Sequence, residues 1–240
     1  MSGLGAAALL SWAWIAPMAV DMYGAMSGLS AWMMTSHWDA RHLLLLWLMW
    51  AVMMAAMMLP SAMPLLMLYD SVLRRRQGAG HVAPLVYAMA GGYLLAWAAF
   101  SVAATALQRG LSLLLVVNPM MEMTSRGAIG ATLLLAAAYQ FTPAKNRCLR
   151  QCRSPLAFVM RRWRRGVAGA VGMGAEHGLY CVGCCWALML LLFAGGVMNL
   201  TVIVGLTAVV LVEKLAPSAA HVTRILGAVM AAAGLWLVLA

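Results

Sequence analysis

The sequence predicts an all-α fold, a polytopic bundle of transmembrane helices, and its composition is the main reason. Of the 240 residues, 65% are hydrophobic and only 9% are charged, whereas soluble globular domains carry about 25% charged residues. The mean hydropathy is +0.90. A compact soluble fold of this length has too little interior to bury so much apolar surface. We therefore expect the lipid bilayer to be the solvent, and residues 1–240 to form a single integral membrane domain.

Breaks between the apolar runs divide the chain into seven candidate spans. They cover residues 4–20, 42–60, 84–107, 127–141, 167–195, 198–213 and 221–240. A helix needs about 20 residues to cross a bilayer, so the fourth and sixth segments are short, and six spans remain an alternative. The first segment has no Lys or Arg before it and no clear small-residue cleavage site, so we expect a retained helix.

Basic residues concentrate in two of the connections between spans. Arg74, Arg75 and Arg76 follow the second segment, and the connection between the fourth and fifth segments, 142–166, is also strongly basic. Both lie on one side of a seven-span bundle, which the positive-inside rule assigns to the cytoplasm. The N-terminus is then cytoplasmic and the C-terminus outside, with outward loops at 21–41 and 108–126. The net charge of +10 reflects this topology, so we expect a lipid bilayer and no nucleic acid as partner.

Sulfur is the second unusual feature of the composition. The chain has 22 Met and 5 Cys residues. Methionine packs flexibly between helices, but thioethers and thiolates also bind soft metal ions such as Cu(I). Composition alone leaves both interpretations open.

One short stretch combines several metal-binding residue types. His177, Cys181, Cys184 and Cys185 are separated by four, three and one residues, so a helix would bring them onto one face. Glu176 precedes them at a depth of about 15 Å in the membrane, where an unpaired ionisable group costs about 2.5–3.5 kcal/mol, and basic partners are scarce in the helices. We predict a metal site of these residues, with Glu176 as a ligand or a nearby base. The alternative is a neutral, hydrogen-bonded Glu176 beside cysteines that only pack.

Methionines extend this pattern. Met173 and Met189 continue the same helix face, and Met49, Met53 and Met57 follow at four-residue steps along the second segment. Such a stripe is expected to form an access path for a soft metal ion, or a flexible seam between helices.

A second metal site is predicted in the first outward loop. His37, Asp39 and His42 are spaced by two and three residues, which brings nitrogen and oxygen ligands together. Solvated loop histidines are the alternative.

A thiol pair is expected on the cytoplasmic side. Cys148 and Cys152 are four residues apart, so a helix would place both thiols on one face. The surrounding basic residues are expected to lower the pKa of these thiols, and reduced thiols could receive or deliver a soft metal ion. An odd number of cysteines argues against a fully disulfide-bonded framework.

Several motifs together point to a family. They are Met57-Met58-Leu59-Pro60-Ser61, Gln140-x-Thr142-Pro143-x-Lys145, Cys148-Leu149-x-x-Cys152-Arg153-x-Pro155, Gly178-x-x-Cys181-x-Gly183-Cys184-Cys185-Trp186, Gly196-Val197-Met198-Asn199 and Glu213-Lys214-x-x-Pro217. As a set they resemble a bacterial family of uncharacterised, predicted metal-binding integral membrane proteins. The resemblance implies a bacterial inner-membrane location and the importance of both cysteine motifs, but it supplies no reaction.

The predicted function is binding of a soft transition metal, copper before others, within the helix bundle, for metal handling or transport. A metallochaperone or other membrane subunits are candidate partners. Two alternatives stay open: a membrane-embedded copper-dependent oxidoreductase or monooxygenase subunit that acts on an apolar substrate, and a scaffold or assembly subunit with structural sulfur. The sequence does not decide whether the chain is an enzyme.

Overall fold

The computed structural model describes residues 2–24, 38–77, 82–216 and 219–240. All the regular structure in these ranges is helical apart from an isolated bridge between Val117 and Met123, which confirms the all-α prediction. The helices are α1 (Ser2–Met22), α3 (Ala40–Gln77), α4 (Val82–Leu113), α5 (Arg126–Gln140), α6 (Pro143–Arg153), α7 (Pro155–Arg162), α8 (Gly166–Met189), α9 (Leu191–Gly195), α10 (Leu200–Leu215) and α11 (Ala219–Leu239).

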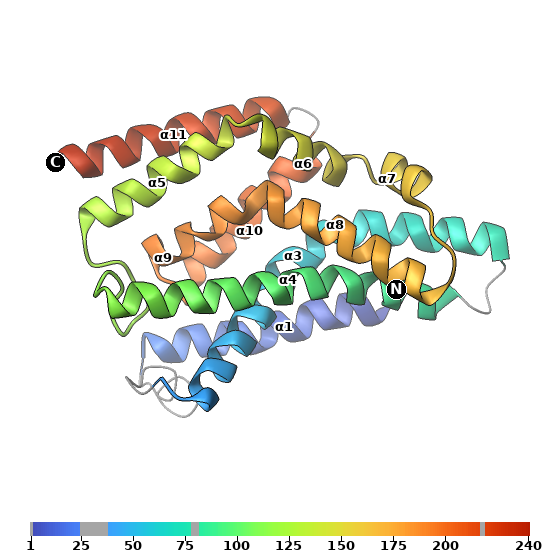
Figure 1. Cartoon of the computed structure of the whole chain (residues 1–240), viewed down its shortest axis with the longest axis horizontal. Helices are drawn as coiled ribbons and strands as arrows, with labels where there is room; N and C mark the ends of the chain where they lie inside the picture. The colour runs from blue at the N-terminus through green and yellow to red at the C-terminus, as the bar shows by residue number, and fades with distance from the viewer. Residues whose placement is uncertain (1, 25–37, 78–81, 217–218) are drawn as a thin grey trace.

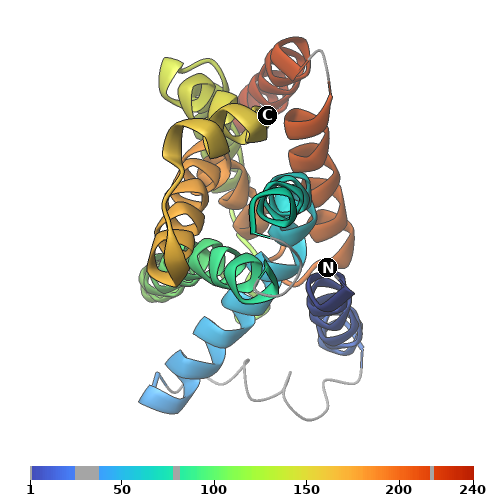
Figure 2. The same ribbon diagram turned by 90° about the vertical axis from the view of Figure 1, so that its right-hand side faces the viewer.

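The long helices run side by side along the longest axis of the molecule. Following the chain, α1, α3, α4, α5, α8, α10 and α11 alternate in direction (Figure 1). Seen along that axis, α3 passes through the bundle, with α4 and α8 on one side and α10 on the other (Figure 2). The bundle core is therefore built around α3.

Five segments of the described residues are long and apolar enough to cross a membrane. They are Gly3–Met22, Ala40–Arg76, Val82–Leu113, Gly166–Gly195 and Ala220–Leu239. Helices α5 and α10, with 15 and 16 residues, fall short of a full span, so the expected count of about seven is not confirmed. The length and composition of the five helices support a membrane location, while the orientation and the inner membrane remain predictions.

The basic connection 142–166 contains two helices, α6 and α7. The connection predicted at 108–126 to face outward starts later in the structure, since α4 continues to Leu113. Its remainder docks on the end of the bundle: the Met123 N–H donates to the Phe193 carbonyl (2.9 Å) and the Val197 N–H to the Met121 carbonyl (3.3 Å). Of the other loop predicted to face outward, 21–41, residues 25–37 lie outside the described ranges.

Local chemistry explains where α6 and α10 begin. The Thr142 hydroxyl accepts a hydrogen bond from the Lys145 backbone N–H at 3.2 Å, and Pro143 occupies the first turn of α6, where a missing N–H costs nothing. The Asn199 side chain accepts from the Thr201 N–H at 3.0 Å at the start of α10. Both caps belong to the sequence motifs, so part of each motif specifies a helix boundary.

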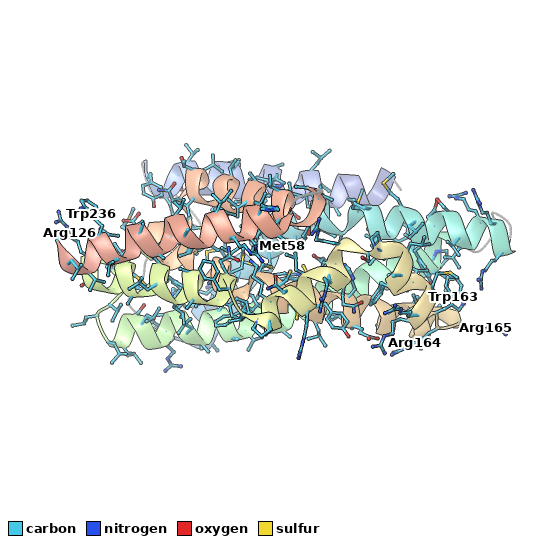
Figure 3. All side chains as sticks on the ribbon, turned by 90° about the horizontal axis from the view of Figure 1, so that it is seen from above. Met58, Arg126, Trp163, Arg164, Arg165 and Trp236 are labelled. Carbon is cyan, nitrogen blue, oxygen red and sulfur yellow. The ribbon has the colours of Figure 1, made fainter. Side chains whose placement is uncertain are left out.

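A proline in α3 ties α1 to the bundle. Pro60 has no N–H, so the carbonyl of Ala56 lacks its usual helical donor. The Trp12 indole N–H of α1 donates to that carbonyl at 3.0 Å. Met58, two residues before Pro60, lies near the middle of the bundle (Figure 3).

Glycines bring α4 and α8 into backbone contact. A Cβ atom at Gly92 would collide with the Val171 carbonyl, and one at Gly174 would collide with the Met89 carbonyl. The two helices can therefore approach closely only because these residues lack side chains. This contact fixes α8, and with it the cysteines of its second half.

Candidate metal centre

Helices α6 and α8 bring the two cysteine motifs together. The Sγ atoms of Cys152 and Cys184 are 3.9 Å apart, and Cys148 packs against Gly183, where an added Cβ would lie 2.8 Å from the Cys148 Sγ. The thiols of α8 are buried, and all the cysteines are free. We refer to Cys148, Cys152, Cys181, Cys184 and Cys185 as the thiol cluster. Sequence spacing predicted each motif separately, and the packing of α6 on α8 joins them.

A lysine ammonium lies against this cluster. The Nζ of Lys214 is 2.8 Å from the Sγ of Cys181 and 2.9 Å from the hydroxyl oxygen of Ser61. The hydroxyl of Tyr93 is 3.0 Å from the same sulfur and donates to the Met58 carbonyl at 3.1 Å. Lys214 and Ser61 belong to the sequence motifs, but the spacing of those motifs did not predict that either residue, or Tyr93, would lie at the cysteines. The position of Lys214 at the end of an apolar run was the one sequence feature that could have indicated a buried positive charge near the site.

The charge of Lys214 requires a nearby anion. Its side chain is only 6% exposed, and a buried ammonium is very costly without a counter-charge. The neighbouring Glu213 carboxylate is already used, because it accepts from Lys145 Nζ at 2.8 Å and from Gln140 Nε2 at 3.1 Å. The sulfur of Cys181 is thus the atom placed to supply the negative charge. A thiolate is also the form of cysteine that binds metal ions.

His177 lies one helical turn before Cys181 on α8. Its ring packs against Phe158 and Tyr93, with centroid distances of 5.0 and 6.0 Å. The Nδ1 atom is buried and has no hydrogen-bond partner in the described part of the chain. A free ring nitrogen in this position is available to a metal ion or a proton donor.

Glu176 points away from the thiol cluster. Its carboxylate lies 3.1 Å from Arg162 Nε and 3.1 Å from Arg164 Nη2, with 19% of the side chain exposed. The expectation that Glu176 lacks a basic partner is therefore wrong. Arg162, the last residue of α7, and Arg164, in the segment that follows, both reach Glu176 on α8, and helix spacing alone does not reveal this contact.

The methionines of the predicted access path are buried. Exposed surface is absent from Met49, Met53, Met57 and Met173 and amounts to 1% for Met189. The Sδ of Met173 accepts from the Arg164 backbone N–H at 3.3 Å, which places it toward the arginine-rich end of α8. Burial suits packing and metal passage equally, so the path remains a prediction.

Cys148 and Cys152 lie on one face of α6, on the side turned toward α8. Burial raises the pKa of the Cys148 thiol, with a further contribution from Cys184. Hydrogen bonds with Cys181 and Cys184, together with burial, raise the pKa of Cys152 well above its ordinary value. The expected lowering by nearby arginines is therefore wrong, because Arg147 and Arg150 are exposed on the opposite side of the helix.

The residues of the second predicted metal site have structural roles where they are described. Asp39 caps α3 by accepting from the His42 backbone N–H at 2.7 Å. The His42 ring is buried against Trp38, at 5.1 Å between centroids, and its Nδ1 has no partner among the described residues. His37 lies outside those residues. A shared metal ion at this site remains a prediction.

The donor chemistry of the thiol cluster fits a soft metal ion, although the cluster is not arranged as a complete ligand shell. Within the described ranges, no three His, Cys, Asp or Glu side chains are grouped so as to hold one metal ion. Two sulfur donors from different helices, those of Cys152 and Cys184, are 3.9 Å apart. Thiolates and thioethers are the ligands that Cu(I) prefers, and both types are buried in this bundle.

Comparison with known proteins adds one finding. A family model described as PpoB2, copper chaperone, matches residues 47–237. No curated protein and no solved structure gives a match. The matched range contains both cysteine motifs, Lys214 and the helices that assemble them, and it covers well over half of the chain; the protein therefore belongs to the PpoB2 copper chaperone family.

Proposed function

We propose that this protein carries Cu(I) within a membrane-embedded helix bundle, using the thiol cluster to take up the ion and pass it on. The contact between Cys152 and Cys184, at 3.9 Å across α6 and α8, is the observation that carries this proposal. Copper is the cargo in this function and undergoes no net redox change. Membership of a copper chaperone family supports copper handling. No observation favours the oxidoreductase or scaffold alternatives.

The two helices of the cluster suit uptake and release. Cys152 is partly buried on α6, which lies outside the five candidate spans, whereas Cys181 and Cys184 are buried in α8. A Cu(I) ion delivered to α6 would therefore meet a thiol at the edge of the bundle first and deeper thiols next. Exchange between neighbouring thiolates lets a soft ion move without ever being released to water.

Lys214 places a positive charge beside the thiol cluster. Its ammonium bonds to Cys181 at 2.8 Å and to Ser61 at 2.9 Å. When Cu(I) binds Cys181 and a second cysteine, that second thiol loses its proton and the bis-thiolate complex carries one negative charge, which the retained Lys214 ammonium compensates. His177, with its unpaired Nδ1, is a further donor one turn away.

The test is a Cu(I) titration of the full chain in detergent, under reducing conditions and against a chromophoric Cu(I) chelator. We expect stoichiometric binding with a sulfur-dominated X-ray absorption spectrum. Cys152→Ser and Cys184→Ser should each weaken binding at least about tenfold, since a metal–thiolate bond is lost. Met160→Leu is the matched control, because it removes an exposed sulfur outside the cluster.

Two results would overturn the proposal. One is unchanged affinity in a Cys152→Ser/Cys181→Ser/Cys184→Ser variant that remains folded by circular dichroism. The other is a metal shell of nitrogen and oxygen ligands, which would move the site to Asp39 and His42 at the start of α3.

A further inference from the structure

A pocket of about 480 Å³ opens beside the candidate metal centre, between the end of α5, α6 and the start of α11. It is lined by Gln140, Phe141, Asn146, Leu149, Arg150, Arg153, Ala220, Thr223 and Arg224. None of these residues holds the thiol cluster. The pocket therefore needs an explanation apart from copper binding.

The lining is strongly basic. Arg150 and Arg153 enter it from α6 and Arg224 enters it from α11, and none of the lining residues is acidic. Arg153 is oriented by a hydrogen bond from its Nη2 to the Ala216 carbonyl at 2.6 Å. Guanidinium groups converging on one cavity are the usual means of binding phosphate or carboxylate.

Two buried polar atoms in the same pocket lack partners. The Oε1 of Gln140 and the Oγ1 of Thr223 make no hydrogen bond within the described chain, and each residue is only 2% exposed. Buried polar atoms are nearly always paired. The hydroxyl can donate to an anion, whereas the amide oxygen requires a donor. The occupant should therefore carry both an anionic group and a hydroxyl or amine.

The position of the pocket along the bundle indicates where such a ligand comes from. Helix α11 has 21 residues, about 31 Å of helix, which matches the roughly 30 Å hydrocarbon core of a bilayer. Thr223 and Arg224 lie in its first turns. Trp236 and Arg126 mark the opposite end of α11 and α5 (Figure 3), as expected for residues at the other interface. The pocket then lies at the level of the lipid headgroups on the arginine-rich side.

We propose that this pocket binds a phosphate ester that carries a free hydroxyl, presented as the headgroup of an anionic membrane lipid of the phosphatidylglycerol type. The guanidinium groups of Arg150 and Arg224 hold the phosphate, and the Thr223 hydroxyl donates to it. The headgroup hydroxyl donates to Gln140 Oε1. The acyl chains continue along the exposed apolar side chains of α11, among them Ile225 and Val229.

The bound headgroup would also touch the wall of the metal centre. Gln140 uses its Nε2 to bond Glu213 at 3.1 Å, and Glu213 is the residue before Lys214. Lipid at the pocket would therefore fix the α5–α6 corner against α10. This lipid site does not depend on the identity of the cargo at the thiol cluster.

The experiment is native mass spectrometry of the full chain in detergent with added phosphatidylglycerol or phosphatidylcholine. We expect phosphatidylglycerol to bind at least about tenfold more tightly. Arg150→Gln/Arg224→Gln should remove most of that preference, and Thr223→Val should weaken phosphatidylglycerol binding several-fold without changing the shape of the side chain. Arg161→Gln/Arg165→Gln is the matched control, since it removes two exposed arginines outside the pocket.

A soluble phosphate ester distinguishes a lipid headgroup from a small soluble molecule as the natural ligand of the pocket. If glycerol phosphate protects the protein from thermal unfolding and the pocket variants abolish that protection, the phosphate site is confirmed with a soluble ester as its ligand. If the pocket variants bind phosphatidylglycerol and glycerol phosphate as wild type does, the site is refuted. Cu(I) binding measured in parallel keeps this outcome separate from that of the thiol cluster.

Discussion

The Nζ of Lys214 and the Sγ of Cys181 lie 2.8 Å apart in the buried centre of the bundle. Glu213, the nearest carboxylate along the chain, is held by Lys145. The ammonium and the sulfur therefore depend on each other for charge compensation. A thiolate formed in this way would bind a metal ion without first losing a proton.

Proton release on metal binding tests this relationship. A cysteine that starts as a thiol loses a proton when it binds a metal, and a thiolate does not. We therefore expect Lys214→Met to release about one more proton per Cu(I) than wild type, measured by calorimetry in buffers of different ionisation enthalpy. The affinity of the variant should be lower at neutral pH and approach that of wild type as the pH rises. Lys214→Arg keeps the charge and serves as control; equal proton release in all three proteins would contradict the thiolate assignment.

The buried ion pair of Lys145 and Glu213 should be important for stability. Their side chains are 1% and 2% exposed, with N and O atoms 2.8 Å apart. Lys145→Met leaves a buried carboxylate without its partner, which costs about 3–5 kcal/mol. Unfolding in detergent should reveal this loss, and Lys145→Met/Glu213→Leu should recover much of it.

An exposed pair provides the comparison for that measurement. Arg74 and Asp70 also lie 2.8 Å apart, one helical turn from each other at the end of α3. Because water screens this pair, Arg74→Met should leave the unfolding midpoint almost unchanged. Similar losses in Arg74→Met and Lys145→Met would show that burial does not determine the effect.

The thiols of α6 should react slowly at neutral pH. The pKa of Cys148 is raised, chiefly by burial, and that of Cys152 is raised by hydrogen bonds with neighbouring thiols and by burial. A raised pKa lowers the thiolate fraction at pH 7, and alkylation requires the thiolate. Modification by iodoacetamide, mapped by mass spectrometry, should therefore be slower than for an exposed cysteine and accelerate only above pH 9. Arg147→Gln should not change the rate, and a marked slowing would restore the role first expected of the arginines.

Sequence pattern was sufficient for the parts of this molecule that depend on spacing along one helix. The helical fold and the common face of His177 and Cys181 follow from composition and from the helical repeat. Contacts between segments that are far apart in the sequence could not be predicted from spacing. Lys214 is 33 residues from Cys181, and Glu176 meets its arginines only because the chain turns after α7. Spacing predicts which side chains share a face, but not which second helix covers that face.

Backbone contact between α4 and α8 should control both stability and copper binding. A Cβ at Gly92 would collide with the Val171 carbonyl, whereas one at the adjacent Gly91 would meet nothing within 4 Å. Gly91→Ala should therefore stabilise the helix slightly, by up to about 1 kcal/mol.

Gly92→Ala should instead destabilise the protein by about 2 kcal/mol or more, because a backbone carbonyl cannot move aside as a side chain can. The displacement of α8 would also move Cys184 away from Cys152, so the affinity for Cu(I) should fall together with the unfolding midpoint. Detergent unfolding and Cu(I) titration of the two alanine variants test both effects. If Gly92→Ala is as stable as Gly91→Ala, α4 and α8 do not meet through their backbones; if it is destabilised but keeps its copper affinity, the position of α8 does not set the geometry of the thiol cluster.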